Sequence, residues 1–372
     1  MPQLHTFSGA VVEKPTILQP LRLGYVALND ALPFIVAKES GLFLKYGLDV
    51  KLSREIGWAS IRDKVEYGEL DAAQALAPMP FAATMGLGNR HPTECLVSLI
   101  LNLNGNAITL SRSLLEKEGD PVQALKRGDF THRSFGKPTL AVVSEFSSHH
   151  FLLRKWLIKN GIHPLKDVHI VTLPPSQMPD ILGNALIDGF CAGEPWNSQA
   201  VRAGTGIVVA SSLDVDPGHV EKVLMVSHRF ATRRSETHIR LIAALIDACE
   251  QCQDPDLRSR FAAILSERRY LNCPREDIEV GLEGRIVTIE THQLGILASQ
   301  FLRFDSNRPS RKHCTWILKQ MQDAGLMRGV SVDPDTLAKI VFAEEYYESA
   351  LKLRSQMGRL EQRVQQTTTG GH

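Results

Sequence analysis

The sequence predicts an α/β protein of two lobes followed by a helical C-terminal region. Its 372 residues exceed one minimal core and suit two lobes. Strand-like and helix-like segments alternate up to about residue 212, and the pattern is mostly helical from about residue 217 onward. The strand–helix–strand alternation predicts a parallel sheet in each lobe.

The first lobe begins with an alternating apolar segment that is typical of a strand. The apolar residues that follow recur at helical spacing until Gly41 and Gly47 interrupt them. The expected elements are a strand over 21–28, a helix over 30–47, a strand over 48–55, a helix over 60–70 and a strand over 71–76.

The second α/β lobe follows a strand that is interrupted at residues 102–106 by Asn and Gly, and it repeats the same alternation. The last part of the chain is divided into helices by Pro and polar breaks. The expected division is an irregular lead-in over 1–19, one lobe over 20–112 plus 215–330, a second lobe over 113–214, a C-terminal helix over 331–366 and a disordered tail over 367–372.

Charge and composition limit the classes of partner. The chain has 42 basic and 41 acidic residues, and its net charge is +1. This balance argues against a bulk electrostatic grip on nucleic acid or on an acidic membrane. We therefore expect no direct nucleic-acid contact and no membrane association.

The cysteines and the N-terminus predict a cytoplasmic protein. Cys249 and Cys252 form a C-x-x-C in an expected helix, with no second pair at zinc spacing, so buried thiols are favoured over a redox motif. The first residues show no secretory signal and no lipid-anchor cysteine, and no stretch of about 18 apolar residues occurs. Reduced thiols fit the same compartment.

Catalytic signatures are missing from the sequence. It contains no G-x-S-x-G, no H-E-x-x-H, no phosphate-binding P-loop and no G-x-G-x-x-G after a strand. Glu194, in the run Cys191–Ala200, is either a catalytic carboxylate or part of a pocket wall. We expect no enzyme activity, no cofactor and no metal.

Polar or aromatic clusters follow several expected strands, where open α/β sheets bind ligands. Each also has an ordinary structural explanation: core packing for the Trp, turn formation for the Asn residues, helix capping for the Ser and His residues, and a strand-to-helix link for the Pro residues. Lys222 would supply the cation that an anion pocket needs, although most lysines are solvated. The clusters are Trp58; Asn104 and Asn106; Ser147, Ser148, His149 and His150; and Pro175 and Gln177.

Five segments together resemble the nitrate- and bicarbonate-binding proteins of cyanobacterial ABC transporters. They are residues 21–50, 57–81, 101–111, 173–178 and 188–201. The resemblance runs from about Leu21 to about Leu326. It implies a two-lobed periplasmic-binding-protein-like fold of type II that holds one small anion in the cleft between the lobes.

The same resemblance implies the residues of the anion pocket. Asn106 stands where the nitrate binders have Gln, and Lys222 matches a lysine that pairs with the nitrate charge, which favours nitrate or nitrite over bicarbonate. The resemblance makes Glu194 structural rather than catalytic. The implied ligand-binding set is Trp58, Asn106, Ser148, His149, Pro175, Ala192, Gly193 and Lys222.

Without a signal, the chain also resembles the cytoplasmic nitrate sensors of the NasS type. Those sensors hold an RNA-binding antiterminator of the ANTAR class inactive and release it when nitrate or nitrite binds. The resemblance thus implies a regulator of nitrate assimilation. One alternative is a nitrate importer's binding subunit whose signal sequence lies upstream, and another is an enzyme of the related thiamine-pyrimidine branch.

Overall fold

The computed structural model describes residues 19–88, 90–127, 136–286, 298–330 and 332–369. Within these ranges the strands form two separate sheets, one in each lobe. The first lobe holds the larger sheet, in the order β11-β4-β10-β3-β1-β2. Its strands are β1 (Gln19–Val26), β2 (Leu48–Glu55), β3 (Ala72–Leu76), β4 (Cys95–Asn104), β10 (Val220–Ser227) and β11 (Leu302–Arg303).

The second lobe holds the smaller sheet, in the order β7-β6-β8-β5-β9. Its strands are β5 (Asn106–Ser111), β6 (Thr139–Val142), β7 (His169–Thr172), β8 (Gly189–Gly193) and β9 (Gly206–Ser211). Its helical segments are α5 (Arg112–Glu118), α6 (Pro121–Arg127), α7 (Ser148–Lys159), η2 (Pro175–Gln177), α8 (Met178–Gly183), α9 (Trp196–Arg202) and α10 (Ser212–Val215).

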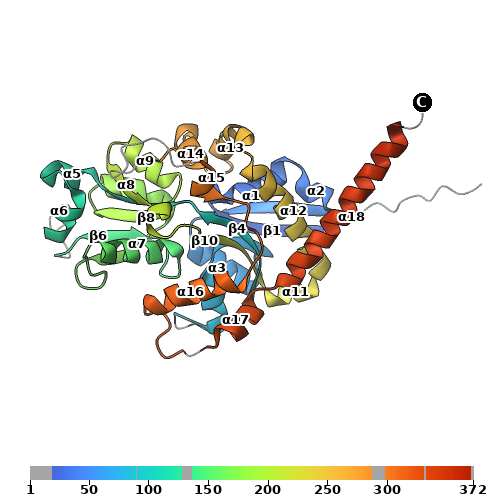
Figure 1. Ribbon diagram of the computed structural model, residues 1–372, viewed down its shortest axis with the longest axis horizontal. Helices are drawn as coiled ribbons and strands as arrows, with labels where there is room; N and C mark the ends of the chain where they lie inside the picture. The colour runs from blue at the N-terminus through green and yellow to red at the C-terminus, as the bar shows by residue number, and fades with distance from the viewer. Residues whose placement is uncertain (1–18, 89, 128–135, 287–297, 331, 370–372) are drawn as a thin grey trace, which may run out of the picture.

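The remaining helices belong to the first lobe and to the C-terminal region, whose long last helix projects from that lobe in Figure 1. They are η1 (Asn29–Ala31), α1 (Leu32–Glu39), α2 (Leu42–Lys45), α3 (Trp58–Tyr67), α4 (Met79–Met85), α11 (His228–Arg233), α12 (Ser235–Gln253), α13 (Pro255–Ser266), α14 (Arg275–Leu282), α15 (Ala298–Phe301), α16 (Arg311–Asp323), α17 (Pro334–Val341) and α18 (Glu344–Thr369).

The two-lobed α/β architecture is confirmed, but the expectation of purely parallel sheets is wrong. β1 pairs in parallel with β2 and β3, and β6 pairs in parallel with β7 and β8. The strands that enter or follow a crossing between lobes run antiparallel to their neighbours: β4 to β10, and β5 to β8 and β9. Both sheets are therefore mixed, with parallel and antiparallel pairs of strands.

The expected lobe boundaries need two corrections. The chain enters the second lobe at Gly105 rather than at residue 113, since β5 already belongs to the smaller sheet. The single helix expected over 331–366 is two helices, α17 and α18, with Phe342 ending the first. α18 also takes in residues 367–369 of the expected tail, whereas residues 370–372 and the lead-in up to residue 18 lie outside the described ranges.

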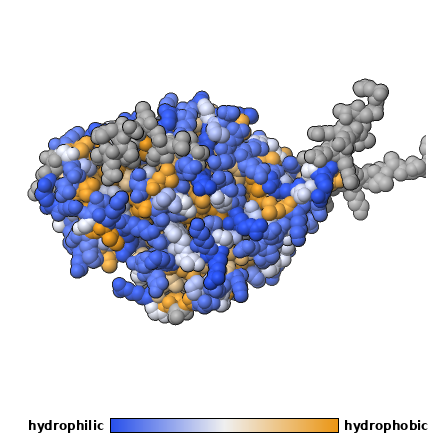
Figure 2. Space-filling model, in the orientation of Figure 1, coloured by the Kyte–Doolittle hydropathy of each residue, from blue (hydrophilic) through white to orange (hydrophobic). Residues whose placement is uncertain are grey.

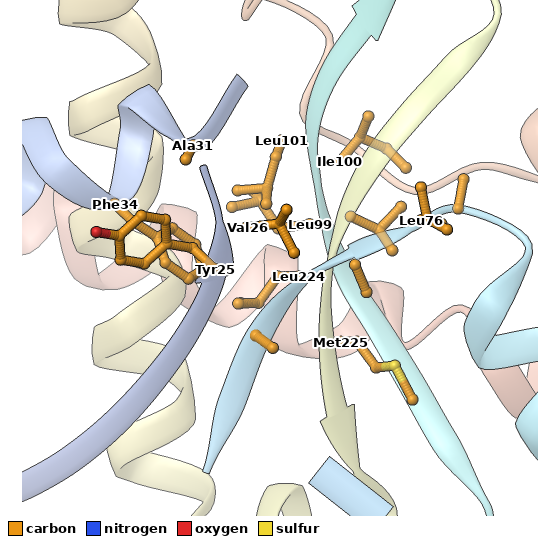
Figure 3. Packing of buried hydrophobic residues seen from close by; sticks show 14 of the residues in the cluster. Tyr25, Val26, Ala31, Phe34, Leu76, Leu99, Ile100, Leu101, Leu224 and Met225 are labelled. Atoms are coloured by element: carbon orange, nitrogen blue, oxygen red, sulfur yellow. The ribbon is translucent and has the colours of Figure 1, made fainter. Parts of the chain in front are cut away.

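Apolar residues of the central strands form the core of the first lobe. Figure 3 shows Val26 from β1, Leu99 from β4 and Leu224 from β10 close together, whereas Leu76 from β3 lies apart from them, toward Ile100 of β4. Burial of such side chains stabilises the fold by about 1.5–3 kcal/mol each. This core holds the carboxyl ends of β1 and β3 in place, next to the second lobe.

In the described ranges, no helix combines the length and the apolar character that a membrane crossing requires. On the face drawn in Figure 2, hydrophobic residues occur in small groups among hydrophilic ones.

One asparagine ties the two main crossings between the lobes together. Asn104 ends β4 with a φ of 60°, and Gly105 follows with a φ of 96°, a conformation that glycine adopts without strain. The Asn104 Oδ1 accepts from the Gly218 N–H at 2.8 Å, on the segment that returns to the first lobe. The Asn104 Nδ2 donates to the Gln300 carbonyl at 2.9 Å. The outgoing and returning segments are therefore held at one point.

Candidate anion site between the lobes

A buried lysine stands between two carboxylates where the lobes meet. The Lys222 Nζ lies 2.7 Å from Asp30 Oδ2 and 2.7 Å from Glu221 Oε1. Lys222 and Glu221 are fully buried, and Asp30 is only 3% exposed. Burial alone would lower the pKa of Lys222, but the two carboxylates raise it, so the ammonium stays charged.

A bulge in β10 brings Glu221 and Lys222 to the same place. Neighbouring residues of a regular strand point to opposite faces of the sheet. Here the register against β4 shifts between Val220 and Lys222, so Glu221 is an extra residue on its strand. Both side chains can then reach the interior between the lobes, which strand alternation does not predict.

Glu221 is held by four residues besides Lys222, most of them from the second lobe. The Asn106 Nδ2 donates to Glu221 Oε2 at 2.5 Å, and the Ser148 hydroxyl donates to the same oxygen. His219 Nε2 lies 3.1 Å from Glu221 Oε2 and His149 Nδ1 lies 3.6 Å from Glu221 Oε1. Although burial raises the pKa of Glu221, Lys222 and the two histidines bring it well below its usual range.

Asp30 is the other carboxylate, and it belongs to the first lobe. The Gln74 Nε2 on β3 donates to Asp30 Oδ1 at 2.6 Å, and the Gln74 Oε1 accepts from the Val26 N–H. Burial raises the pKa of Asp30 by more than Lys222 lowers it. Asp30 is therefore the more readily protonated of the two carboxylates. Asp30, Glu221 and Lys222 are called the charged triad below.

Polar atoms without partners surround the charged triad. Among the described residues, Trp58 Nε1, Asn106 Oδ1 and both ring nitrogens of His149 are buried and form no hydrogen bond. Leaving such a group unpaired costs about 1–3 kcal/mol. The Trp58 ring also lies over the Lys222 ammonium, at 5.2 Å from Nζ to the ring centroid. Several unpaired donors and acceptors around one charged group are what a small polar ligand needs.

The His149 ring is neutral in this environment. Burial lowers its pKa to about 3, more than Glu221 raises it. A neutral imidazole keeps one N–H donor and one acceptor nitrogen.

The structure brings most of the predicted pocket residues together. Trp58, Asn106, Ser148, His149 and Lys222 all contact the charged triad or belong to it. A Cβ on Gly193 would lie 3.4 Å from Asn106 Oδ1 and 3.6 Å from Asp30 Oδ2, and Ala192 is buried beside it on β8.

Pro175 stands apart from this group, and Lys222 differs from its expected role. Pro175 is buried in η2, and its neighbours Ser176 and Gln177 line a separate cavity with Trp196. The expectation that Lys222 offers its charge to an anion is not met in this state, because Asp30 and Glu221 already neutralise it. Ser147 caps α7 as predicted, accepting from the His150 N–H.

Four residues of the site escaped prediction: Asp30, Gln74, His219 and Glu221. Asp30 follows the first strand, which is a ligand-binding position in α/β sheets, so a signal was present. Glu221 is next to Lys222 and was hidden by the strand alternation that the bulge breaks.

No three His, Cys, Asp or Glu side chains of the described ranges are arranged to hold a metal ion. The expectation that the protein needs no metal and no cofactor stays a prediction.

Glu194 lies at the junction of the lobes, outside the charged triad. Its carbonyl accepts from the Asn29 N–H at 2.8 Å, and its Oε2 accepts from the Ser198 N–H. Burial raises its pKa to about 7. These contacts join η1 of the first lobe to the turn before α9 of the second, which is a structural role.

Comparison with known proteins places these features in a family. Residues 15–266 match the NMT1-like family. The nitrate import ATP-binding protein NrtC of Synechocystis is 38% identical over 304 residues, covering 81% of this chain and 45% of that protein. The bicarbonate transport ATP-binding protein CmpC of Synechococcus elongatus is 37% identical over 302 residues, covering 81% of the chain and 44% of that protein. The chain thus spans less than half of these two relatives.

Binding proteins match over more of their own length. The nitrate/nitrite binding protein NrtA of Synechococcus elongatus is 31% identical over 341 residues, covering 89% of this chain and 77% of that protein. The crystal structure of the periplasmic nitrate-binding protein NrtA from Synechocystis superposes with a TM-score of 0.81 at 26% identity, covering 90% of this chain and 89% of that one. The chain belongs to the NMT1-like family and is close to its nitrate- and bicarbonate-binding proteins.

Proposed function

We propose that this protein binds nitrate or nitrite at the charged triad and reports its presence to a partner protein. The observation that carries the proposal is the group of unpaired polar atoms around Lys222. Trp58 and neutral His149 each supply an N–H donor, and Lys222 supplies the positive charge. A flat monovalent oxyanion accepts hydrogen bonds at every oxygen, so this donor set suits it.

The regulatory part of the proposal rests on where the site lies. Within the triad, Lys222 binds Asp30 of the first lobe. Glu221 accepts hydrogen bonds from Asn106 and Ser148 of the second lobe. An anion that competes for Lys222 changes the contacts between lobes, and a partner that prefers one arrangement is then released or held. The proposed partner is an ANTAR-class antiterminator, and the proposed role is control of nitrate-assimilation genes.

We place the protein in the cytoplasm. All six cysteines lie in described parts of the chain, and all are buried and unpaired. Unpaired thiols are usual in a reducing compartment. The binding subunit of a nitrate importer is the alternative, because the relatives include periplasmic and transport proteins. Fractionation of the native cells, followed by detection of the chain, separates the two locations.

Anion binding is tested by calorimetric titration with nitrate, nitrite and bicarbonate. The informative variant is Trp58→Phe, which keeps the ring over Lys222 and removes the Nε1 donor. We expect nitrate or nitrite affinity to fall by about tenfold, as for the loss of one charge-assisted hydrogen bond. Trp156→Phe is the matched control, because Trp156 is 4% exposed on α7 and Trp58 is 2% exposed.

Two results would count against this proposal. Tight bicarbonate binding with no response to nitrate or nitrite would reassign the ligand. An equal loss of affinity in both tryptophan variants would mean that the Trp58 N–H is not a ligand donor. The regulatory step has its own test: gel filtration of the protein with an ANTAR-domain protein, where the complex should dissociate when nitrate is added.

A further inference from the structure

Another cavity lies between the lobes, and Trp58, whose ring lies over Lys222 of the charged triad, forms part of its wall. Its volume is about 490 Å³. It is lined from the first lobe by α3 and α4, and from the second by β6, the loop after it, α7, the segment after α7, and β7. One water molecule takes about 30 Å³ of liquid volume, and small organic ligands occupy sites of about 300–1,000 Å³. The cavity is therefore too large to be explained by nitrate alone.

Arg154 is the basic group of this cavity that has no counter-ion. It is half-buried on α7, and no carboxylate of the described residues forms an ion pair with it. Burial accordingly lowers its pKa, with no acidic neighbour to oppose the effect. Arg62, across the cavity on α3, is already paired, with its Nε 3.0 Å from Asp63 Oδ1. A guanidinium that is partly removed from water is stabilised by an anion.

The other walls are partly apolar, and His150, which also lines the cavity, is neutral at pH 7. Val142, Val143 and Phe146 are buried residues that line the cavity. Burial lowers the pKa of His150 to about 4, and its Nδ1 donates to the Glu145 carbonyl at 2.9 Å. The carboxylate of Glu145 is the acidic group among the lining residues, and that residue is exposed. The cavity thus combines one unpaired guanidinium with apolar wall.

We propose that this cavity is a second anion site, which takes a small organic anion. Arg154 binds the carboxylate, sulfonate or phosphate group of the ligand, and Val142, Val143 and Phe146 cover its apolar part. Trp58 is the wall that this site shares with the triad, since it lines the cavity and also lies over Lys222. Because both lobes line the cavity, its occupant stabilises the arrangement of the lobes seen here and couples to the triad.

The test uses 4-fluorobenzoate as the probe and ¹⁹F NMR line width as the measurement. The wild-type protein should broaden the probe signal at millimolar concentration. Arg154→Gln should weaken binding by about tenfold, and Arg154→Lys should retain part of it, because the cation remains. Arg260→Gln is the matched control: Arg260 is exposed on α13, so this change removes the same charge away from the cavity. It should bind the probe like the wild type.

Several results would overturn the proposal. They are no broadening by the wild type, equal binding by Arg154→Gln and the wild type, or an equal loss in Arg154→Gln and Arg260→Gln. Complete displacement of the probe by saturating nitrate would mean that there is one site, not two. Thermal melts of each variant show whether the fold is kept. This inference does not depend on the proposed function, because a protein that binds no nitrate at all can still broaden the probe through Arg154.

Discussion

Single residues decide the electrostatics of the interior between the lobes. Lys222 forms ion pairs with Asp30 and Glu221, and all three side chains are buried. A buried ion pair adds little net stability, but breaking it leaves an unpaired charge in a dry interior. Lys222 is therefore part of the fold as well as of the site, and a binding test based on its removal would confuse the two roles.

Replacing Lys222 by Met should lower the free energy of unfolding by about 3–5 kcal/mol, because two buried carboxylates lose their cation. Urea denaturation measures this loss. Adding Asp30→Asn and Glu221→Gln to Lys222→Met removes the unpaired charges and should restore much of the stability. Lys319→Met, at an exposed pair with Asp323, should change stability by less than about 0.5 kcal/mol. This account would be contradicted if Lys222→Met were as stable as Lys319→Met.

Glu194→Gln should stabilise the protein increasingly between pH 4.5 and pH 7. Burial raises the folded-state pKa of Glu194 from 4.5 to about 7. The folded state then binds the proton more tightly than the unfolded state, so the wild type loses stability as pH rises through this window. The advantage of Gln at pH 8 should be on the order of 1–3 kcal/mol. Thermal unfolding at pH 5 and pH 8 tests it, and an advantage that shrank as pH rose would contradict it.

At the scale of elements, the junction of the lobes depends on close packing of α14 against η1 and the turn before α9. Gly281 on α14 leaves no room for a side chain: a Cβ there would lie 2.6 Å from Asn29 Nδ2 and 2.6 Å from Glu194 Cβ. The Asn29 Nδ2 also donates to the Ile278 carbonyl on the same helix. Three elements from distant parts of the chain therefore meet at one glycine.

Gly281→Ala should lower the free energy of unfolding by about 1–3 kcal/mol, because the added methyl group forces these elements apart. The intrinsic helix preference of Ala works in the opposite direction, by about 1 kcal/mol. Gly358→Ala on α18 is the matched control, since nothing lies within 4 Å of a Cβ at that position. Chemical denaturation of both variants separates packing from helix preference. If Gly281→Ala were stabilising, the contact would be loose.

At the scale of the whole molecule, the sequence predicted the two-lobed α/β class, which is confirmed. It also named five residues that the structure places at the charged triad, four in contact with it and one, Lys222, within it. Strand and helix periodicity depends on local burial, which a single sequence displays. The direction of β4 and β10 and the bulge at Glu221 depend on pairing between strands more than 100 residues apart, so no local pattern reports them. For the same reason the sequence predicts an anion as the partner of Lys222, whereas in the structure Lys222 binds Asp30, 192 residues away.

The charged triad makes anion uptake by this protein a proton reaction as well. With both carboxylates ionised, two negative charges and one positive charge leave the triad with one negative charge. A second anion in the same dry space is unfavourable unless a proton enters with it. Asp30, whose pKa burial raises, is the group to receive it. The heat of nitrate binding should then vary with the ionisation enthalpy of the buffer, with a slope of about one proton per anion. A heat that was the same in every buffer would mean that no proton enters with the anion.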